Sequence, residues 1–172
     1  MAAHRSSLDT AATQSCYGRR PLYDRRMRIY LDACCLQRPL DDRSQPRVNV
    51  EAEAILTILG LVENGDVELI SSDAVEFEVK RTPDAERRDS AGEILKLATR
   101  TLRLDDDIET DAEALVSTGF KPLDALHLAF AMHGEVEYLC TCDDKLRKKA
   151  QRLRSLRIAV VSPLELVDKV AP

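Results

Sequence analysis

Residues 119–143, GFKPLDALHLAFAMHGEVEYLCTCD, contain the change of pattern that decides the fold. Their first half predicts a helix, because Pro122 suits a first helical turn and Gly134 follows the expected helix end near Met132. Their second half contains a short apolar run, residues 138–141, of the kind that forms a strand. A helix that leads into such a strand is typical of an α/β protein.

The same alternation continues outward from this segment over most of the chain. Further strands are predicted at residues 28–32, 67–70 and 158–161. Helices are predicted over residues 50–63, 74–80, 85–99 and 108–117, with a basic helix between the last two strands. Short strands separated by helices predict a three-layer α/β fold, with helices on both sides of a mainly parallel central sheet.

Capping residues mark the ends of several predicted helices. Asn49 is the expected N-cap of the helix over residues 50–63, after a polar loop, and Gly65 is expected just beyond its C-terminal end. Ser71 or Ser72 is the expected N-cap of the following helix. The helix boundaries are therefore predicted from side-chain chemistry as well as from periodicity.

The first 26 residues differ from the rest of the chain. They lack apolar periodicity, so residues 1–26 are expected to be a disordered N-terminal extension. Residues 27–172 are long enough to form one domain with its own core. Met27 directly precedes the first predicted strand and is a candidate for the native start.

Composition excludes several classes of protein. Apolar residues make up 44% of the chain, and no apolar run reaches the roughly 18–20 residues of a membrane-spanning helix. No apolar signal-peptide region follows the early basic residues, so a cytoplasmic location with no membrane partner is expected. A net charge of −5 argues against nucleic-acid binding over the whole surface, and aromatic residues at 4% offer little for base stacking.

Five cysteines, an odd number at irregular spacing, are poor material for a disulfide framework. Cys140 and Cys142 lie on the same face of a predicted strand, which makes a zinc site conceivable. A second pair of ligands at the usual metal-site spacing is missing, so reduced, buried cysteine is the favoured interpretation. The adjacent Cys34 and Cys35 are interpreted in the same way.

Acidic residues follow the predicted strands. Asp32 ends the first predicted strand, and Glu78 lies on the helix after the second. Asp124 lies at the start of the helix that begins at Pro122, and Asp143 follows the predicted strand over residues 138–141. Parallel sheets bind ligands at the carboxyl ends of their strands. Two carboxylates about 4 Å apart repel by about 4 kcal/mol at an effective dielectric constant of about 20. Four converging acids therefore predict a divalent cation, and oxygen ligands select Mg²⁺ or Mn²⁺.

The residues alone leave three questions about this acidic group undecided. Glu76 and Glu78 lie two residues apart on a helix, so only one of them can face the site. Asp143 and Asp144 are adjacent, and either could be the acid that matters. His127, three residues after Asp124, is a candidate general base, but no second His accompanies it, so an ordinary structural role is favoured. His4 and His133 carry no signal.

A basic run follows Asp143. Seven basic residues occur between positions 145 and 157, and such a run by itself indicates a solvated helix face. If the acids hold cations and a phosphate substrate, the first turn of this helix lies near the site. Contacts with the RNA backbone are then expected from Lys145, Lys148, Arg81 and Lys121.

Four segments carry a resemblance to a known family. They are IYLDACCLQRP at 29–39, SSDAVEFEVKR at 71–81, GFKPLDALHLAFA at 119–131 and LCTCDDKLRKKA at 139–150. In this order and spacing, the chain from Met27 to about Val167 resembles the PIN domain, and within it the VapC-like toxins of toxin–antitoxin pairs. The resemblance implies a PIN-like fold and an endoribonuclease that uses Mg²⁺ or Mn²⁺.

The resemblance also implies site residues and partners. The metal ligands and catalytic acids would be Asp32, Glu78, Asp124 and Asp143, with Glu78 chosen over Glu76 because Val79 and Ser72 stand at the family's spacing from it. Thr141 and Asp143 match a Thr-x-Asp pattern, which makes Asp144 an N-cap or an outer-shell residue and Thr141 a second-shell residue able to orient a water molecule. An RNA substrate, a small antitoxin and a homodimer are the implied partners.

Two alternative functions are compatible with parts of this pattern. Asp32 could be a phosphoryl acceptor, but haloacid-dehalogenase-like phosphatases need a second Asp where this chain has Cys34. Response-regulator receivers need paired acids upstream, where this chain has apolar or basic residues. The second alternative is a PIN-like module that binds RNA or protein without catalysis, against which the full set of four acids argues.

Overall fold

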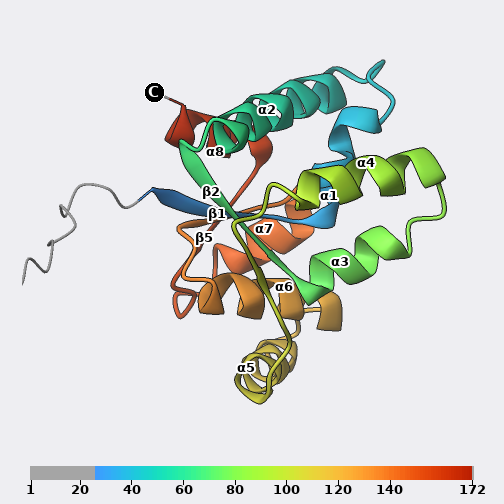
Figure 1. Ribbon diagram of the computed structural model, residues 1–172. Helices are drawn as coiled ribbons and strands as arrows, with labels where there is room; N and C mark the ends of the chain where they lie inside the picture. The colour runs from blue at the N-terminus through green and yellow to red at the C-terminus, as the bar shows by residue number, and fades with distance from the viewer. Residues whose placement is uncertain (1–25, 172) are drawn as a thin grey trace, which may run out of the picture.

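The computed structural model describes residues 26–171, which form a five-stranded sheet in the order β3-β2-β1-β4-β5 (Figure 1). All neighbouring strands are parallel. The strands are β1 (Met27–Leu31), β2 (Val67–Ser72), β3 (Arg100–Leu102), β4 (Tyr138–Cys140) and β5 (Ala159–Val161). Because β1 lies in the centre, its end is flanked by the ends of β2 and β4.

Helices cover both faces of this sheet. They are α1 (Ala33–Gln37), α2 (Pro46–Glu63), α3 (Asp73–Lys80), α4 (Ala85–Leu95), α5 (Asp106–Ser117), α6 (Pro122–His133), α7 (Asp144–Ala150) and α8 (Pro163–Val170), with a short 3₁₀ turn, η1 (Arg38–Leu40). The helices α2 and α8 pack together on one side of the sheet, and α6, with α5 against it, lies on the other (Figure 1). This arrangement confirms the predicted three-layer α/β fold with a parallel sheet.

Two predicted helix boundaries are wrong. The helix predicted over residues 85–99 ends at Leu95, because Thr99 instead donates its backbone N–H to Leu69 O (2.9 Å) and leads into the edge strand β3. Pairing with β2 thus overrides the helix propensity of residues 96–99. The second helix begins at Pro46, with Gln45 rather than Asn49 at the N-cap, since proline suits a first helical turn.

Other capping predictions are confirmed. Ser72 caps α3, and its Oγ accepts the N–H of Val75. Gly65 follows the C-cap of α2 with a φ of +78°, a left-handed conformation that glycine adopts without steric cost. The turn from β2 into α3, which carries Glu78, is therefore fixed by its own local hydrogen bonds.

The centre of the core is β1. Ile29, Tyr30 and Leu31 are almost completely buried between neighbouring strands and the two helical layers. The ladder continues one residue further, where the N–H of Asp32 donates to Cys140 O (3.0 Å). The central, buried strand of the sheet therefore places Asp32 at its carboxyl edge.

The predicted disordered extension, residues 1–26, lies outside the described residues except for Arg26. Among residues 26–171, no helix combines the length and the apolar character required to cross a membrane.

Candidate metal centre

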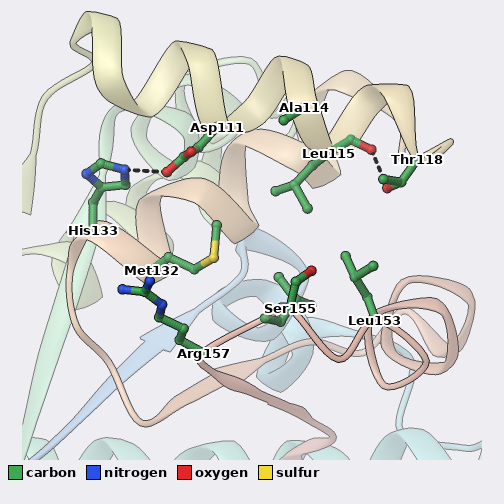
Figure 2. A pocket seen from close by; sticks show the side chains of 10 residues that line it. Asp111, Ala114, Leu115, Thr118, Met132, His133, Leu153, Ser155 and Arg157 are labelled. Carbon is green, nitrogen blue, oxygen red and sulfur yellow. Dashed lines mark hydrogen bonds and ion pairs between the residues drawn. The ribbon is translucent and has the colours of Figure 1, made fainter.

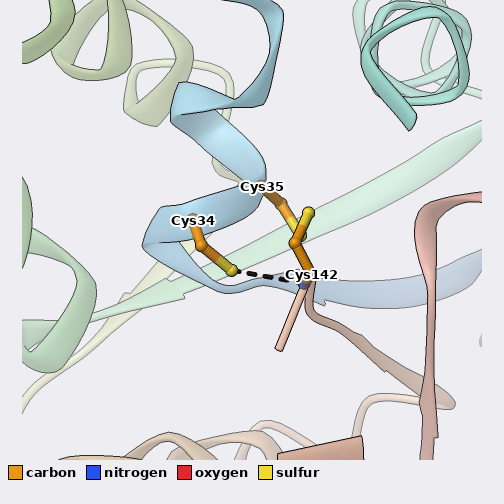
Figure 3. A group of neighbouring side chains, drawn as sticks. All are labelled: Cys34, Cys35 and Cys142. Carbon is orange, nitrogen blue, oxygen red and sulfur yellow. Dashed lines mark hydrogen bonds between the residues drawn. The ribbon is translucent and has the colours of Figure 1, made fainter. Parts of the chain in front are cut away.

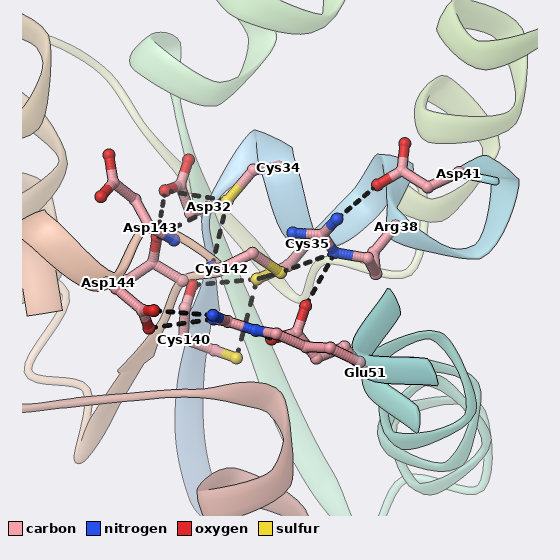
Figure 4. A network of polar contacts seen from close by, with 12 residues as sticks. Asp32, Cys34, Cys35, Arg38, Asp41, Glu51, Cys140, Cys142, Asp143 and Asp144 are labelled. Carbon is pink, nitrogen blue, oxygen red and sulfur yellow. Dashed lines mark hydrogen bonds and ion pairs between the residues drawn. The ribbon is translucent and has the colours of Figure 1, made fainter. Parts of the chain in front are cut away.

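Asp32 is the most deeply buried acid at the carboxyl edge, with 8% of its surface exposed. Its Oδ2 accepts hydrogen bonds from Thr141 Oγ1 (2.7 Å) and from Cys34 Sγ (3.3 Å). Thr141 Oγ1 in turn accepts the backbone N–H of Asp143 (3.0 Å; Figure 4). Burial, followed by the nearby Cys34, raises the pKa of Asp32 to about 7, so its charge is poorly compensated by the protein alone.

Glu78 reaches the same place from α3 through His127 of α6. His127 Nε2 lies 2.7 Å from Glu78 Oε2 and 3.8 Å from Asp32 Oδ1. Burial favours the neutral imidazole, but the hydrogen bond with Glu78 and the charges of Asp32 and Glu78 outweigh it and raise the pKa of His127. The histidine therefore links two of the four predicted acids.

A buried chain of hydrogen bonds holds this histidine. His127 Nδ1 lies 2.8 Å from the Tyr30 hydroxyl, which lies 2.6 Å from Ser72 Oγ. One set of directions satisfies every group: Ser72 donates to Tyr30, Tyr30 donates to Nδ1 of neutral His127, and Nε2–H donates to Glu78. Because Ser72 also accepts the N–H of Val75, the chain is anchored in the backbone of α3.

His127 is almost completely buried, and both of its ring nitrogens have hydrogen-bond partners. A His with 2% exposure on an otherwise apolar helix face needs buried polar partners, and Tyr30 precedes Asp32 by two residues, on the same face of the strand. The apolar neighbours of His127 and the position of Tyr30 are visible in the sequence, but the burial of His127 and its contact with Tyr30, 97 residues away, are not.

Asp124 and Asp143 complete the acidic edge. Burial raises the pKa of Asp124, Lys121 lowers it, and the charges of Asp143 and Asp32 raise it further, so Asp124 interacts electrostatically with both acids. Asp143 is the N-cap of α7, and its Oδ1 accepts the N–H groups of Lys145 (2.7 Å) and Leu146 (3.2 Å). The start of the basic helix is thus tied to the acidic edge.

Glu76 and Asp144, the acids next to the predicted site residues in sequence, form ion pairs with basic residues. Glu76 Oε2 pairs with Lys80 Nζ (3.0 Å) and Arg103 Nη1 (3.3 Å). Asp144 does not cap α7, because Asp143 does; its carboxylate is held by Arg47 (2.7 Å) and Arg147 (3.1 Å) instead. Geometry therefore separates Glu78 from Glu76, and Asp143 from Asp144.

The donor chemistry fits a hard divalent cation. Ligand atoms of Asp32, Glu78 and His127 lie within 4.8 Å of one another, whereas Asp124 and Asp143 are outside this group and Asp124 interacts electrostatically with Asp32 and Asp143. Both nitrogens of His127 are already in hydrogen bonds, so the available donors are carboxylate oxygens, which Mg²⁺ and Mn²⁺ prefer. The raised pKa values of Asp32 and Asp124 reflect a charge that a cation would neutralise.

A groove of about 410 Å³ opens beside these acids. Its lining residues are Ala33, Cys34, Gln37, Phe77, Glu78, Arg81, Thr82 and Leu123. Phe77 is 52% exposed, and the Arg81 guanidinium lies 5.2 Å from its ring centre, so the groove offers an aromatic face and a positive charge next to Glu78.

The other basic residues predicted to contact a substrate occupy separate positions. Lys121 is the N-cap of α6, whereas Lys145 and Lys148 lie on α7, and all three are exposed. Further along the basic run, Arg147 is ion-paired with Asp144 and Glu165, and Lys149 lies 4.6 Å above the Phe120 ring. Only part of the basic run is therefore free to meet an anion.

A further cavity, of about 470 Å³, lies between α5, the C-terminal end of α6 and residues 153–157 (Figure 2). His133 Nε2 and Asp111 Oδ2 meet across its rim at 2.8 Å. Asp124 lies at the opposite end of α6, so this cavity is separate from the acidic edge.

Comparisons with known proteins agree with this geometry. The family model of the PIN domain matches residues 29–152. No curated protein matches the sequence.

Three solved structures share the fold. PAE2754 of Pyrobaculum aerophilum has a TM-score of 0.54 and 16% identity, over 84% of this chain and 90% of that one. VapBC2 of Rickettsia felis, bound to a DNA fragment from its promoter, has a TM-score of 0.51 and 13% identity, over 79% and 98%. VapC20 of Mycobacterium tuberculosis, a toxin that cleaves the sarcin-ricin loop, has a TM-score of 0.50 and 15% identity, over 70% and 94%.

Asp32→Asn is expected to stabilise the metal-free protein at pH 8. A carboxyl group whose pKa rises to about 7 on folding destabilises the folded state once it ionises, here by roughly 1–3 kcal/mol. This cost is absent near pH 4, grows as the pH rises toward about 7 and is complete above it. Thermal denaturation in chelator at pH 4 and pH 8 measures the difference, and Mn²⁺ should raise the melting temperature of the wild type more than that of the variant. A variant less stable than the wild type at pH 8 contradicts this account.

His127→Gln is expected to weaken Mn²⁺ binding by about 10- to 100-fold, because an acid loses the partner that orients it. The matched control is His133→Gln on the same helix, whose imidazole pairs with Asp111 away from the acidic edge. Calorimetric titration with Mn²⁺ compares the two, with circular dichroism as the check on folding. Equal Mn²⁺ affinity in both variants would show that His127 has no part in positioning the ligands.

Proposed function

The chain belongs to the PIN-domain family, and from this premise we propose that it is a divalent-metal-dependent endoribonuclease, acting as the toxin of a toxin–antitoxin pair or as an orphan nuclease of the family. The observation that carries the proposal is the meeting of Asp32 and Glu78, remote along the chain, at one edge of the sheet beside a groove, with Asp124 close enough to interact electrostatically with Asp32.

Each acid has a role in this proposal. Asp32, Asp124 and Asp143 hold Mg²⁺ or Mn²⁺ directly, and Glu78 is either a further ligand or a proton acceptor for water. A cation bound there would supply Lewis acidity, which lowers the pKa of water and neutralises charge on a phosphate. The raised pKa values of Asp32 and Asp124 support this assignment, because burial and the neighbouring acidic groups outweigh the effects of His127 and Lys121.

Other residues keep the acids in position before any ligand arrives. Thr141 fixes one carboxylate oxygen of Asp32, and its own orientation is fixed by the N–H of Asp143. His127, held by Tyr30, orients Glu78. Such outer hydrogen bonds lower the cost of assembling a site, because the ligands do not have to give up alternative rotamers on binding.

The groove supports a nucleic-acid substrate. Arg81 and Phe77 line it together with Glu78, so a phosphate and a base could be held on the same side as the acids. Lys121 and Lys145 add positive charge at the N-terminal ends of α6 and α7, which also favour anions, and Lys148 adds a further charge in the last turn of α7. These contacts position a phosphate backbone and do not read sequence.

The structures of similar fold support RNA as the substrate class. VapC20 is described as a toxin that cleaves the sarcin-ricin loop, and VapBC2 was solved with promoter DNA. Those properties belong to those proteins, and for this chain a small antitoxin partner and a homodimer remain part of the proposal.

Asp32→Asn and Asp124→Asn are each expected to lower Mn²⁺-dependent RNA cleavage by at least about 100-fold, since each removes a charged ligand. Glu78→Gln should also impair cleavage, whereas Glu76→Gln, two residues away in the surface ion pairs, is the matched control and should retain it. Cleavage of structured RNAs, with and without Mn²⁺, measures these effects.

Two results would count against the proposal. Metal-dependent cleavage that survives both Asp32→Asn and Asp124→Asn removes the acids from the chemistry. RNA binding by the wild type with no cleavage in Mn²⁺ or Mg²⁺ favours the alternative of a PIN-like binding module.

Arg81→Gln is expected to weaken RNA binding similarly for different RNA sequences and to reduce its dependence on salt by about one phosphate contact. Lys169→Gln on α8, also exposed, is the matched control for the loss of one positive charge. Binding at several salt concentrations in Ca²⁺ gives the slope for each protein. Identical slopes for both variants mean that the groove does not carry the RNA backbone.

A further inference from the structure

A second group of metal-ligating side chains lies beside Asp32. Cys34 and Cys35 come from α1 and Cys142 follows β4, and their side chains converge (Figure 3). Ligand atoms of the three residues all lie within 4.8 Å of one another, and all three are free thiols. Two cysteine segments more than 100 residues apart therefore supply, in space, the ligands that neither segment has alone.

The spacing of the sulfur atoms suits a tetrahedral ion. Cys35 Sγ lies 3.7 Å from Cys142 Sγ. Two thiolates bound to one zinc ion at about 2.3 Å each lie about 3.7–3.8 Å apart. Cys34 Sγ is held next to this pair, because it accepts the backbone N–H of Cys142 (3.3 Å). No large rearrangement is needed to bring the three sulfurs around one ion.

The positive charge of Arg38 lies next to the sulfur atoms of this group. Arg38 Nε lies 3.2 Å from Cys142 Sγ, and the guanidinium is held by Asp41 (2.7 Å) and Glu51 (3.1 Å; Figure 4). A divalent ion with three thiolates carries a net charge of −1, which the adjacent guanidinium offsets. The position of Arg38 therefore favours thiolate ligation over a neutral thiol cluster.

We propose that Cys34, Cys35 and Cys142 form a binding site for a thiophilic divalent cation such as Zn²⁺, with its fourth position open to water. Three sulfur donors select such an ion over Mg²⁺ or Mn²⁺, which the neighbouring carboxylates prefer. The sulfur of Cys140 also lies 3.7 Å from that of Cys35. Cys140 is nevertheless outside the proposed site, because it is not in the group of three residues whose ligand atoms all lie within 4.8 Å of one another. The site goes beyond the proposed nuclease activity and does not depend on it.

Cobalt(II) is the spectroscopic probe for this site. The full-length protein is kept reduced and carries Cys16→Ser throughout, because Cys16 lies outside the described residues. Titration with Co²⁺ should give one equivalent of bound ion with thiolate-to-cobalt charge-transfer bands and the visible bands of tetrahedral Co²⁺. Zn²⁺ should then abolish these bands by displacement, and Mg²⁺ should not.

Single substitutions identify the ligands. Cys34→Ser, Cys35→Ser and Cys142→Ser should each lower Co²⁺ affinity on the order of 100-fold or abolish the charge-transfer bands. Cys140→Ser is the matched control from the same cluster and should retain them. Asp32→Asn should also retain them, which separates this site from the acidic edge even if no RNA cleavage is found.

Folding is followed by circular dichroism in every variant. Should the buried Cys35→Ser fail to fold, the partly exposed Cys34→Ser and Cys142→Ser decide the matter. The proposal is overturned if the reference protein shows no charge-transfer bands, or if the bands persist at full intensity in folded Cys34→Ser and Cys142→Ser.

Discussion

A carboxylate at the end of the central strand, Asp32, is the constraint around which the structure is arranged. Burial between β2 and β4 takes it out of water, two hydrogen bonds reach one of its oxygens, and the basic side chain paired with it is His127, 3.8 Å from its Oδ1. An ionised acid in such a place has a high free energy unless something else neutralises it. The packing that stabilises the sheet thus buries an acid at its edge, and a bound cation would lower the free energy of that acid when it is ionised.

The surrounding side chains orient the acids of the site but do not neutralise the charge of Asp32. Tyr30 and His127 fill buried space and, at the same time, fix the orientation of Glu78. Asp143 caps α7 with one oxygen while its backbone N–H orients Thr141. The same residues therefore contribute both to the stability of the fold and to the geometry of the site.

Most of the fold could be predicted from local pattern. The strand ends, the turn at Ser72 and the proline at the start of α6 depend on neighbours in sequence, and these predictions identified the edge at which Asp32 and Glu78 lie. The edge strand β3 was missed because its three residues, one of them arginine, form a strand only through pairing with β2. The contacts of His127 and the meeting of Cys35 with Cys142 were missed for the same reason: they join segments about 100 residues apart, and spacing along the chain carries no sign of them.

The strand order also determines when the acidic edge can exist. The first strand of the chain lies between β2 and β4, and Ile29 pairs with Tyr138, which is made 109 residues later. Contacts between residues this far apart in sequence form late in folding, because the entropy cost of closing a long loop comes before the free energy gained from the contact. Until residues 138–141 have been synthesised, Asp32 therefore has neither the neighbouring strand β4 nor Thr141. A protein with this topology carries no assembled centre until these residues have left the ribosome.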